Sequence, residues 1–171
     1  MKQDPNNYWE QLERLEKLIR AAEFKAGVIF SFHSLIIGLL FERLEAIRPV
    51  LVESMLLMVT GGVWLMFVLI SVYHCFKCFR PQIEMKYDSN VLFFRDAVHA
   101  FGDIDEYGDK IIEIFGKEED FYRQLAEQIH AECKIIDQKF ISVNSAIKYF
   151  GISCALILLI GIISIVQMFF L

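Results

Sequence analysis

The sequence has none of the motifs that mark common enzyme active sites. It contains no G-x-S-x-G, P-loop, H-E-x-x-H or G-x-G-x-x-G segment. Basic residues are not in excess, and the net charge of -5 argues against binding to a nucleic acid polymer. The acidic residues between positions 103 and 120 are typical of a solvated face. We therefore expect no catalytic residues and no enzyme activity.

Cysteine is scarce and irregularly spaced, unlike the disulfide framework of a secreted domain. The chain's four cysteines are Cys75, Cys78, Cys133 and Cys154. A structural zinc site needs four ligands in matched pairs, and the sequence offers a single C-x-x-C, preceded by His74. The other candidate ligands form no second pair: His99, His130 and Cys133. We expect no metal and no cofactor; the motif fits juxtamembrane packing or lipid modification of a cysteine near the bilayer.

The first 20 residues are polar and lack the apolar core of a cleavable signal peptide. Apolar residues elsewhere occur in long runs with almost no charge. They make up 56% of the chain, against roughly 45–50% in soluble domains, and the mean hydropathy is +0.43. The runs cover residues 26–41, 50–74 and 149–171. They predict an all-α membrane protein with about three transmembrane helices.

The polar segments between the runs are predicted to be mostly helical. Apolar residues recur every three or four positions over residues 8–22, which predicts an amphipathic helix within residues 1–25. Asn7 is the expected cap of this helix. Residues 42–49 are expected to form a short polar turn that ends at Pro49 and joins the first two spans into a hairpin at 26–74.

The region 75–148 is expected to hold three elements. They are an extended piece at 83–94, a short helix at 103–115 ended by Gly116, and a long helix at 118–148. Apolar residues of the long helix follow steps close to a heptad repeat and lead into the last span. These residues are Tyr122, Leu125, Ile129, Cys133, Ile136, Phe140, Val143 and Ile147. This stripe fits packing on the N-terminal helix of the same chain or an inter-subunit stalk.

Lysine and arginine set the predicted orientation. Residues 1–25 carry five of them and residues 75–148 carry ten, whereas the 42–49 turn carries two and nothing basic follows the last span. Because basic segments stay on the cytoplasmic side, the N-terminus and the 75–148 region are expected in the cytoplasm and the C-terminus outside. The expected location is the cell inner membrane.

Polar residues in or beside the spans are candidates for gating. His33 lies inside the first span, where it either packs against neighbouring helices or lines a pore or senses pH. Glu53 either reaches water at the outer surface or has a pore role. Glu23 and Lys25 precede the first span, either as interface anchors or as an ion pair that fastens this span to the cytoplasmic loop.

An aromatic segment in the cytoplasmic region is the candidate ligand site. Phe93 and Phe94 stand beside Arg95 and Asp96. Aromatic faces stack on nucleobases and arginine pairs with phosphate, so this combination suits a nucleotide. A pair of phenylalanines is also common in a core, and this alternative stays open at this point.

Three segments follow one another along the chain: A-E-F-K-A-G-V at 22–28, Pro81 with N-V-L-F-F at 90–94, and I-K-Y-F at 147–150. In sequence and in order they resemble the landmarks of the Pycsar membrane effectors (PycTM family). The first resembles the family's A-D-x-K-A-G entry into the first span, and the last resembles the entry into the final span. The resemblance covers nearly the whole chain. Glu23 stands where the family tends to have Asp, and Arg95 where a small residue is common.

The resemblance implies a bacterial antiphage effector. On infection a cyclase makes a cyclic pyrimidine mononucleotide, which the effector senses, and the membrane then loses integrity so that growth stops or the cell dies. The implied regulatory ligand is cyclic UMP or cyclic CMP, and the implied assembly is a homo-oligomer in the lipid bilayer. We expect the ligand to contact the following residues: Lys25, Lys86, Phe93, Phe94 and Arg95. Two alternatives are a non-enzymatic membrane adaptor or scaffold and a constitutive small channel.

Overall fold

The computed structural model describes residues 4–81 and 89–170, and their side chains except those of residues 50, 51, 53 and 168–170. Within these ranges every regular element is an α-helix. Three helices are long and apolar enough to cross a membrane: Pro5–Glu42, Met55–Phe79 and Glu118–Gln167. The expected class, an all-α membrane protein, is confirmed.

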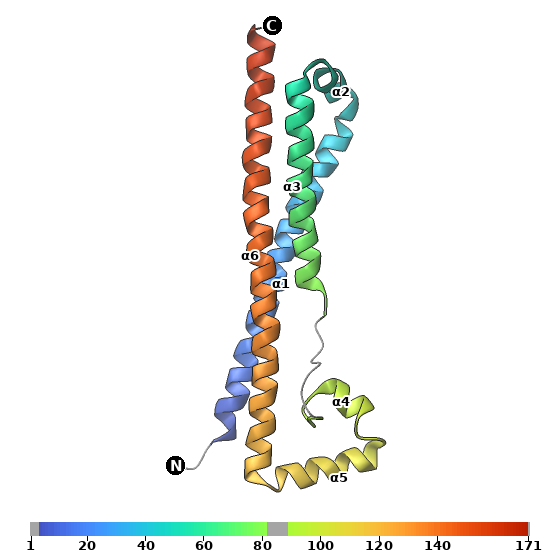
Figure 1. The fold of residues 1–171 in the computed structure, drawn as a ribbon, viewed down its shortest axis with the longest axis vertical. Coiled ribbons are helices and arrows are strands. Elements are labelled where there is room, and N and C mark those ends of the chain that lie inside the picture. Colours follow the sequence, from blue (N-terminus) through green and yellow to red (C-terminus); the bar gives the residue numbers. More distant parts are fainter. Residues whose placement is uncertain (1–3, 82–88, 171) are drawn as a thin grey trace. The chain divides into compact units, whose positions relative to one another are not determined.

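Helix α1 (Pro5–Glu42) joins the expected amphipathic segment and the first span into one helix of 38 residues (Figure 1). Its start is set by Asp4, whose Oδ1 accepts the Asn6 N–H at 3.0 Å. Pro5 suits the first helical position because its φ is fixed and it has no N–H to satisfy. Asn7, expected as the cap, therefore lies inside the first turn instead.

The polar segment after α1 forms a second helix rather than a turn. Helix α2 (Leu44–Glu53) contains Pro49, and α3 (Met55–Phe79) begins five residues later than the expected second span. The boundary is a capping effect: the extended Ser54 places its Oγ to accept the Leu57 N–H at 3.4 Å. Gln167 Nε2 of α6 also donates to this Oγ at 3.0 Å.

Short helices follow α3 on the far side of the undescribed residues 82–88. The expected extended piece at 83–94 lies partly in that range; its described end, residues 89–93, forms a turn that leads into α4 (Phe94–His99). Helix α5 (Ile104–Phe115) ends at the expected position. Asp103 caps α5 by accepting the N–H groups of Asp105 and Glu106, both at 3.0 Å.

Helix α6 (Glu118–Phe170) has 53 residues and continues without a break into the last span (Figure 1). The chain divides into two compact units. The loop unit comprises Met1–Ala21 and Pro81–Gln138, and the span unit comprises Ala22–Arg80 and Lys139–Leu171. Helices α1 and α6 contribute residues to both units.

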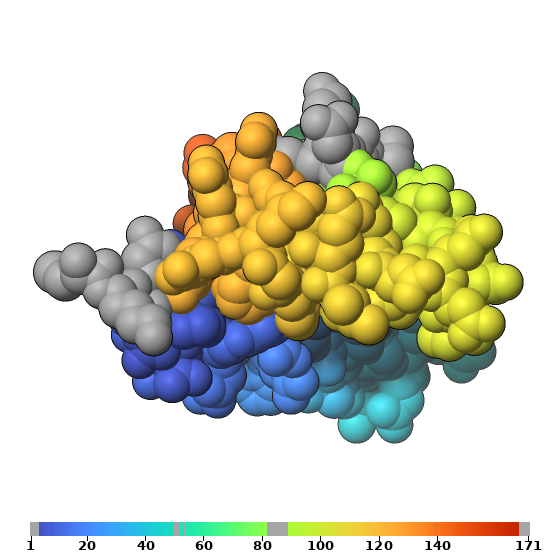
Figure 2. All heavy atoms as spheres, turned by 90° about the horizontal axis from the view of Figure 1, so that it is seen from below, coloured from blue at the N-terminus to red at the C-terminus, as the bar shows by residue number. Residues whose placement is uncertain are grey.

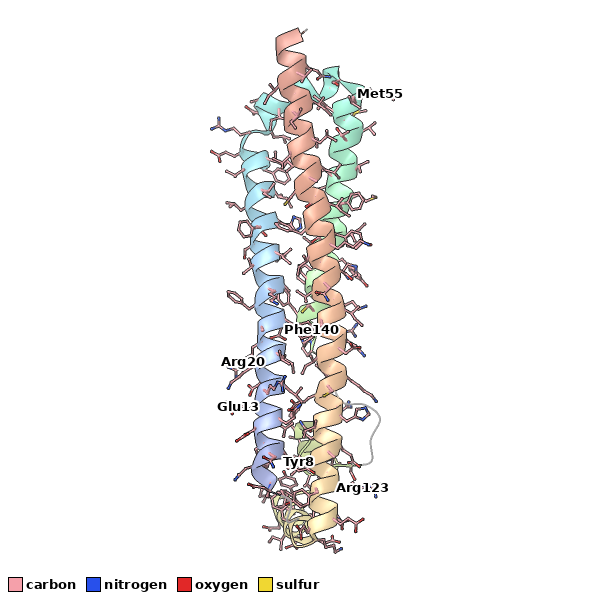
Figure 3. All side chains as sticks on the ribbon, turned by 90° about the vertical axis from the view of Figure 1, so that its left-hand side faces the viewer. Tyr8, Glu13, Arg20, Met55, Arg123 and Phe140 are labelled. Atoms are coloured by element: carbon pink, nitrogen blue, oxygen red, sulfur yellow. The ribbon has the colours of Figure 1, made fainter. Side chains whose placement is uncertain are left out.

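In the loop unit, α1 packs against the start of α6. The rings of Tyr8 and Tyr122 lie 5.3 Å apart, and Leu15 and Leu125 are buried. Glu13 and Arg20 point away from this contact, as Figure 3 shows. In this part of the chain the apolar stripe of α6 packs on the same chain's N-terminal helix.

Helix α5 joins the start of α6 through a ring contact. Phe115 and Phe121 lie 4.6 Å apart, and the atoms of the two helices meet without a gap in Figure 2. Two members of the expected heptad-like stripe, Cys133 and Ile147, are exposed. A straight helix with 3.6 residues per turn drifts relative to a seven-residue repeat, so a strict repeat does not stay on one face.

The core of the span unit is built from small side chains. Short side chains let membrane helices approach closely. Helices α1, α3 and α6 supply its buried members: Ala22, Ala26, Ile29, Cys75, Cys78, Val143 and Ala146. Phe140 packs against this core and lies among the side chains between α1 and α6 in Figure 3. The buried Ser71 Oγ donates to the Ala146 carbonyl of α6 at 2.9 Å.

Candidate functional site

A buried lysine joins three helices of the span unit. Lys139 of α6 is 3% exposed, and its Nζ donates to Glu23 Oε1 of α1 at 2.7 Å. The same nitrogen donates to the carbonyl oxygen of Cys78 in α3 at 2.6 Å. We call Glu23, Cys78 and Lys139 the three-helix junction. It is a charged contact inside an otherwise apolar, small-residue core.

The chemistry of the junction follows from where α3 ends. Cys78 is the penultimate residue of α3, so its carbonyl is one of the last four, which have no partner within the helix. A cation at this end satisfies the carbonyl and also interacts favourably with the helix dipole. Burial of the ammonium group is tolerated because both an anion and a carbonyl accept its hydrogen bonds.

The junction stands where the chain passes between the two units. The first segment of the span unit runs from Ala22 to Arg80, and its second segment begins at Lys139. Glu23 and Cys78 lie within two residues of the first two of these positions, and Lys139 is the third. The junction therefore fastens together the three chain segments that connect the span unit to the loop unit.

The structure gives Glu23 a partner that sequence analysis did not identify. Glu23 was expected to pair with the cytoplasmic loop or to anchor at the interface beside Lys25. It pairs with Lys139, which lies within the 75–148 region expected to form that loop, whereas Lys25 is exposed. A signal was present in the sequence: Lys139 lies three residues after Ile136 and four before Val143, which is the spacing of a buried helix face.

A second polar cluster lies in the loop unit. Asn90 is fully buried, and its Nδ2 donates to the Gln124 carbonyl at 3.0 Å and to Glu127 Oε2 at 3.1 Å. The Val91 N–H donates to Gln124 Oε1 at 2.9 Å, and the Tyr107 hydroxyl donates to the Val91 carbonyl at 2.9 Å. We call these five residues the Asn90 anchor, because they fasten the loop before α4 to α6 and α5.

The Asn90 side chain also organises its own turn. Its Oδ1 accepts the Leu92 N–H at 2.9 Å, and Asp96 Oδ2 accepts the Asn90 N–H at 3.0 Å. A side chain that satisfies nearby backbone groups stabilises a turn that has no ladder or helix of its own. The N-V-L-F-F landmark is therefore a docking element in this structure, a role that the sequence alone did not indicate.

The turn directs the two adjacent phenylalanines apart. Phe93 is 3% exposed, whereas Phe94 is 74% exposed at the start of α4. Arg95 is also exposed. Phe94 and Arg95 are therefore the exposed members of this segment, while Phe93 contributes to packing. Lys86 lies outside the described residues, and Lys25 belongs to the span unit. The assignment of these residues to a ligand stays a prediction.

His33 is buried in the span unit without a polar partner. It is 1% exposed, and neither ring nitrogen has a hydrogen-bond partner among the described residues. Its ring packs edge-on against Phe150 of α6, with centroids 5.1 Å apart. This contact shows that the residue packs between helices. Glu53 ends α2, and its side chain lies outside the described residues.

The His74-Cys75-x-x-Cys78 motif lies within α3, and both cysteines are fully buried in the core of the span unit. This burial favours packing over lipid modification for these two thiols. Within residues 4–81 and 89–170, no three histidine, cysteine or acidic side chains come together as a metal site would require.

A charged network covers the exposed face of α5. Glu113 accepts hydrogen bonds from Lys110 Nζ at 2.7 Å and from Lys117 Nζ at 3.0 Å. These two lysines lower the pKa of Glu113 to about 2. Glu113 therefore belongs to a solvated, internally paired cluster on the acidic segment.

Comparison with known proteins shows the family. The Pycsar effector protein domain matches residues 7–166, which is nearly the whole chain. The chain is similar to the Pycsar effector protein PtPycTM of Propioniciclava tarda, with 23% identity over 161 residues that cover 90% of this chain and 78% of that protein. No solved structure matches. The chain thus belongs to the Pycsar effector family, and this membership supports its role as an effector of antiphage defence.

Proposed function

We propose that this protein is a ligand-gated membrane effector. Its loop unit senses a cyclic pyrimidine mononucleotide, and its span unit then disrupts the inner membrane, which arrests growth or kills the cell. The N-terminus and the loop unit face the cytoplasm, where such a nucleotide is made, and the C-terminus lies outside. Family membership and three apolar helices support the proposal.

The observation that carries this proposal is the double role of α6. The helix supplies Gln124 and Glu127 to the Asn90 anchor and Lys139 to the three-helix junction. A ligand that repositions the anchored loop therefore acts on the helix that holds the junction. The ligand must bind the active arrangement more tightly than the resting one, because equal affinity for both shifts nothing.

The proposed ligand contacts follow from exposure and charge. Phe94 offers an open aromatic face for the pyrimidine ring, and Arg95 beside it offers a cation for the cyclic phosphate. Lys86 remains a candidate for further anion pairing. Several copies of the chain are required for a pore, since the three spans of one copy pack around a filled core.

The test uses the full-length protein in liposomes loaded with a self-quenching dye. Cyclic UMP or cyclic CMP is expected to release the dye, whereas cyclic AMP and cyclic GMP are expected to leave the liposomes intact. Dye release without any nucleotide would favour a constitutive channel. Intact liposomes with every nucleotide would overturn the proposal and favour an adaptor or scaffold.

The residue-level test compares two exposed apolar residues of α4. Phe94→Ala is expected to raise the nucleotide concentration needed for half-maximal release by about tenfold, since stacking on a base contributes about 1–3 kcal/mol. Val98→Ala, on the same short helix and also exposed, is the matched control. Equal effects of the two variants would remove Phe94 from the ligand site.

A further inference from the structure

An apolar cavity lies in the span unit among α1, α2, α3 and α6. Its volume is about 390 Å³. All of its lining residues are apolar, including Leu44 and Ile47 of α2, Trp64 of α3 and Ile157 of α6. Ordered water needs polar partners, so a cavity of this composition suits an apolar occupant.

Two glycines of α3 help to leave this space open. Gly61 and Gly62 both line the cavity. A Cβ atom placed on Gly62 would meet no other atom within 4 Å, so this glycine is not required for close helix packing. The hollow beside α3 is instead the volume that larger side chains at these positions would occupy.

Charged residues at the end of α1 and at the start of and within α2 stand next to the lining residues. Arg43 precedes Ile47 by four residues, and Arg48 follows Leu44 by four, which places each arginine on the same helix face as a lining residue. Glu42 and Glu45 alternate with these cations. Within the described part of the chain none of these four charges forms an ion pair.

We propose that the cavity holds an acyl chain of a zwitterionic phospholipid with a primary ammonium headgroup, which, unlike the choline group, can donate hydrogen bonds to carboxylates. The phosphate pairs with Arg43 and Arg48, and the ammonium group pairs with Glu42 and Glu45. A flexible acyl chain matches an all-apolar cavity, and a headgroup of both signs matches the alternating charges. The site is independent of nucleotide sensing.

Tryptophan fluorescence tests the occupant directly. The chain has two tryptophans, so Trp9→Phe leaves Trp64, which lines the cavity, as the sole emitter. The full-length variant is placed in phosphatidylcholine bilayers with increasing fractions of phosphatidylethanolamine brominated on its acyl chains. Bromine quenches on contact, so a bound lipid is expected to quench Trp64 with saturation at a low mole fraction. Quenching that only follows the bulk mole fraction would overturn the proposal.

Matched glycine variants separate the cavity from the general lipid surface. Gly62→Leu fills the cavity without a clash at Cβ and is expected to abolish the saturable quenching. Gly151→Leu is the control, because this glycine of α6 has equally open surroundings and does not line the cavity. Saturable quenching that persists in Gly62→Leu would place the lipid elsewhere.

A separate experiment tests which headgroup the arginines bind. Arg43→Gln together with Arg48→Gln is expected to raise the mole fraction for half-maximal quenching by about tenfold. Brominated phosphatidylglycerol, which is anionic, is expected to bind less tightly than phosphatidylethanolamine; the reverse order would overturn the zwitterionic assignment. An unquenched Trp64 in a protein that cross-links as a dimer would assign the cavity to a second copy. No nucleotide is used, so failure here leaves the proposed function untouched.

Discussion

The Asn90 anchor and the three-helix junction use polar side chains for different purposes. In the loop unit, the turn before α4 has no ladder or helix to satisfy its backbone, so Asn90 and Gln124 bond mostly to backbone groups. In the span unit, helices satisfy their own backbones, and a polar side chain is free to join one helix to another. Lys139 does this for α1, α3 and α6.

The two units therefore differ in how much stability is lost when one polar contact is removed. Loss of a hydrogen bond in the anchor loosens one loop, because Gln124 and Glu127 are only partly buried and no charge is left behind. Loss of a partner in the junction leaves a charge in a buried core. The cost of the second event is larger, since an uncompensated buried charge costs more than an unmade neutral hydrogen bond.

The largest effect is expected from Glu23→Gln. This change leaves the buried ammonium group of Lys139 without an anion, at a cost of about 2–3 kcal/mol in unfolding free energy, reduced from the fully buried case because Glu23 is 40% exposed. Lys139→Met removes the charge itself and should cost about 1–2 kcal/mol, mainly for the Cys78 carbonyl. The measurement is denaturant unfolding in detergent micelles.

The double variant Glu23→Gln/Lys139→Met sharpens this result. It should be no less stable than Glu23→Gln alone, because the charge that Glu23 neutralises is gone. Glu10→Gln and Lys148→Met are controls, since both residues are exposed. Strictly additive single effects would show that the two side chains do not depend on each other, and the contrast between the units would fail.

A smaller and local effect is expected from Asn90→Ala. The change removes three side-chain hydrogen bonds and should cost about 1–3 kcal/mol for docking of residues 89–99. Hydrogen exchange should speed up in this loop and stay unchanged in the core of the span unit. Ser89→Ala, at an exposed neighbour, is the control. Faster exchange throughout α1, α3 and α6 would mean that the anchor stabilises the whole molecule.

Much of this arrangement was predictable, for identifiable reasons. Long apolar runs predicted the spans, since a bilayer requires about 20 apolar residues in a helix. The ends were harder because single caps decide them: Ser54 delays the second span, and Asp4 starts α1 before Asn7. The polar composition of residues 42–49 predicted a turn, but Leu44 and Ile47 give this segment an apolar face, and it forms α2.

The contacts of the site were less accessible to sequence analysis. Glu23 was singled out, but its partner Lys139 lies 116 residues away, and only tertiary structure brings the two together. Phe93 and Phe94 are adjacent in sequence and were expected to act together. The turn held by Asn90 buries one ring and exposes the other, which no periodicity indicates.

His33→Leu is expected to have a modest effect of the opposite sign. Both ring nitrogens are buried without hydrogen-bond partners among the described residues, so an apolar side chain should raise the unfolding free energy by about 1 kcal/mol. Nucleotide-triggered dye release should be retained if the residue only packs. Loss of dye release in a protein that is more stable would instead indicate that His33 lines the pore.

The smallest effect is expected at Glu113, where an exposed charge network contrasts with the buried junction. Lys110 and Lys117 lower the pKa of Glu113 to about 2 from its ordinary value of 4.5. Because the pKa is lower in the folded state, the contribution is complete above about pH 4.5 and is lost as the pH falls towards 2. Hydrogen exchange in α5, corrected for its intrinsic pH dependence, should show slightly lower protection at pH 3 than at pH 6, and Glu113→Gln should remove most of this difference. Glu119→Gln, at another exposed carboxylate, should leave it unchanged. The expected effect is small because exposed ion pairs contribute little individually. A large pH effect that survives Glu113→Gln would show that other carboxylates stabilise α5.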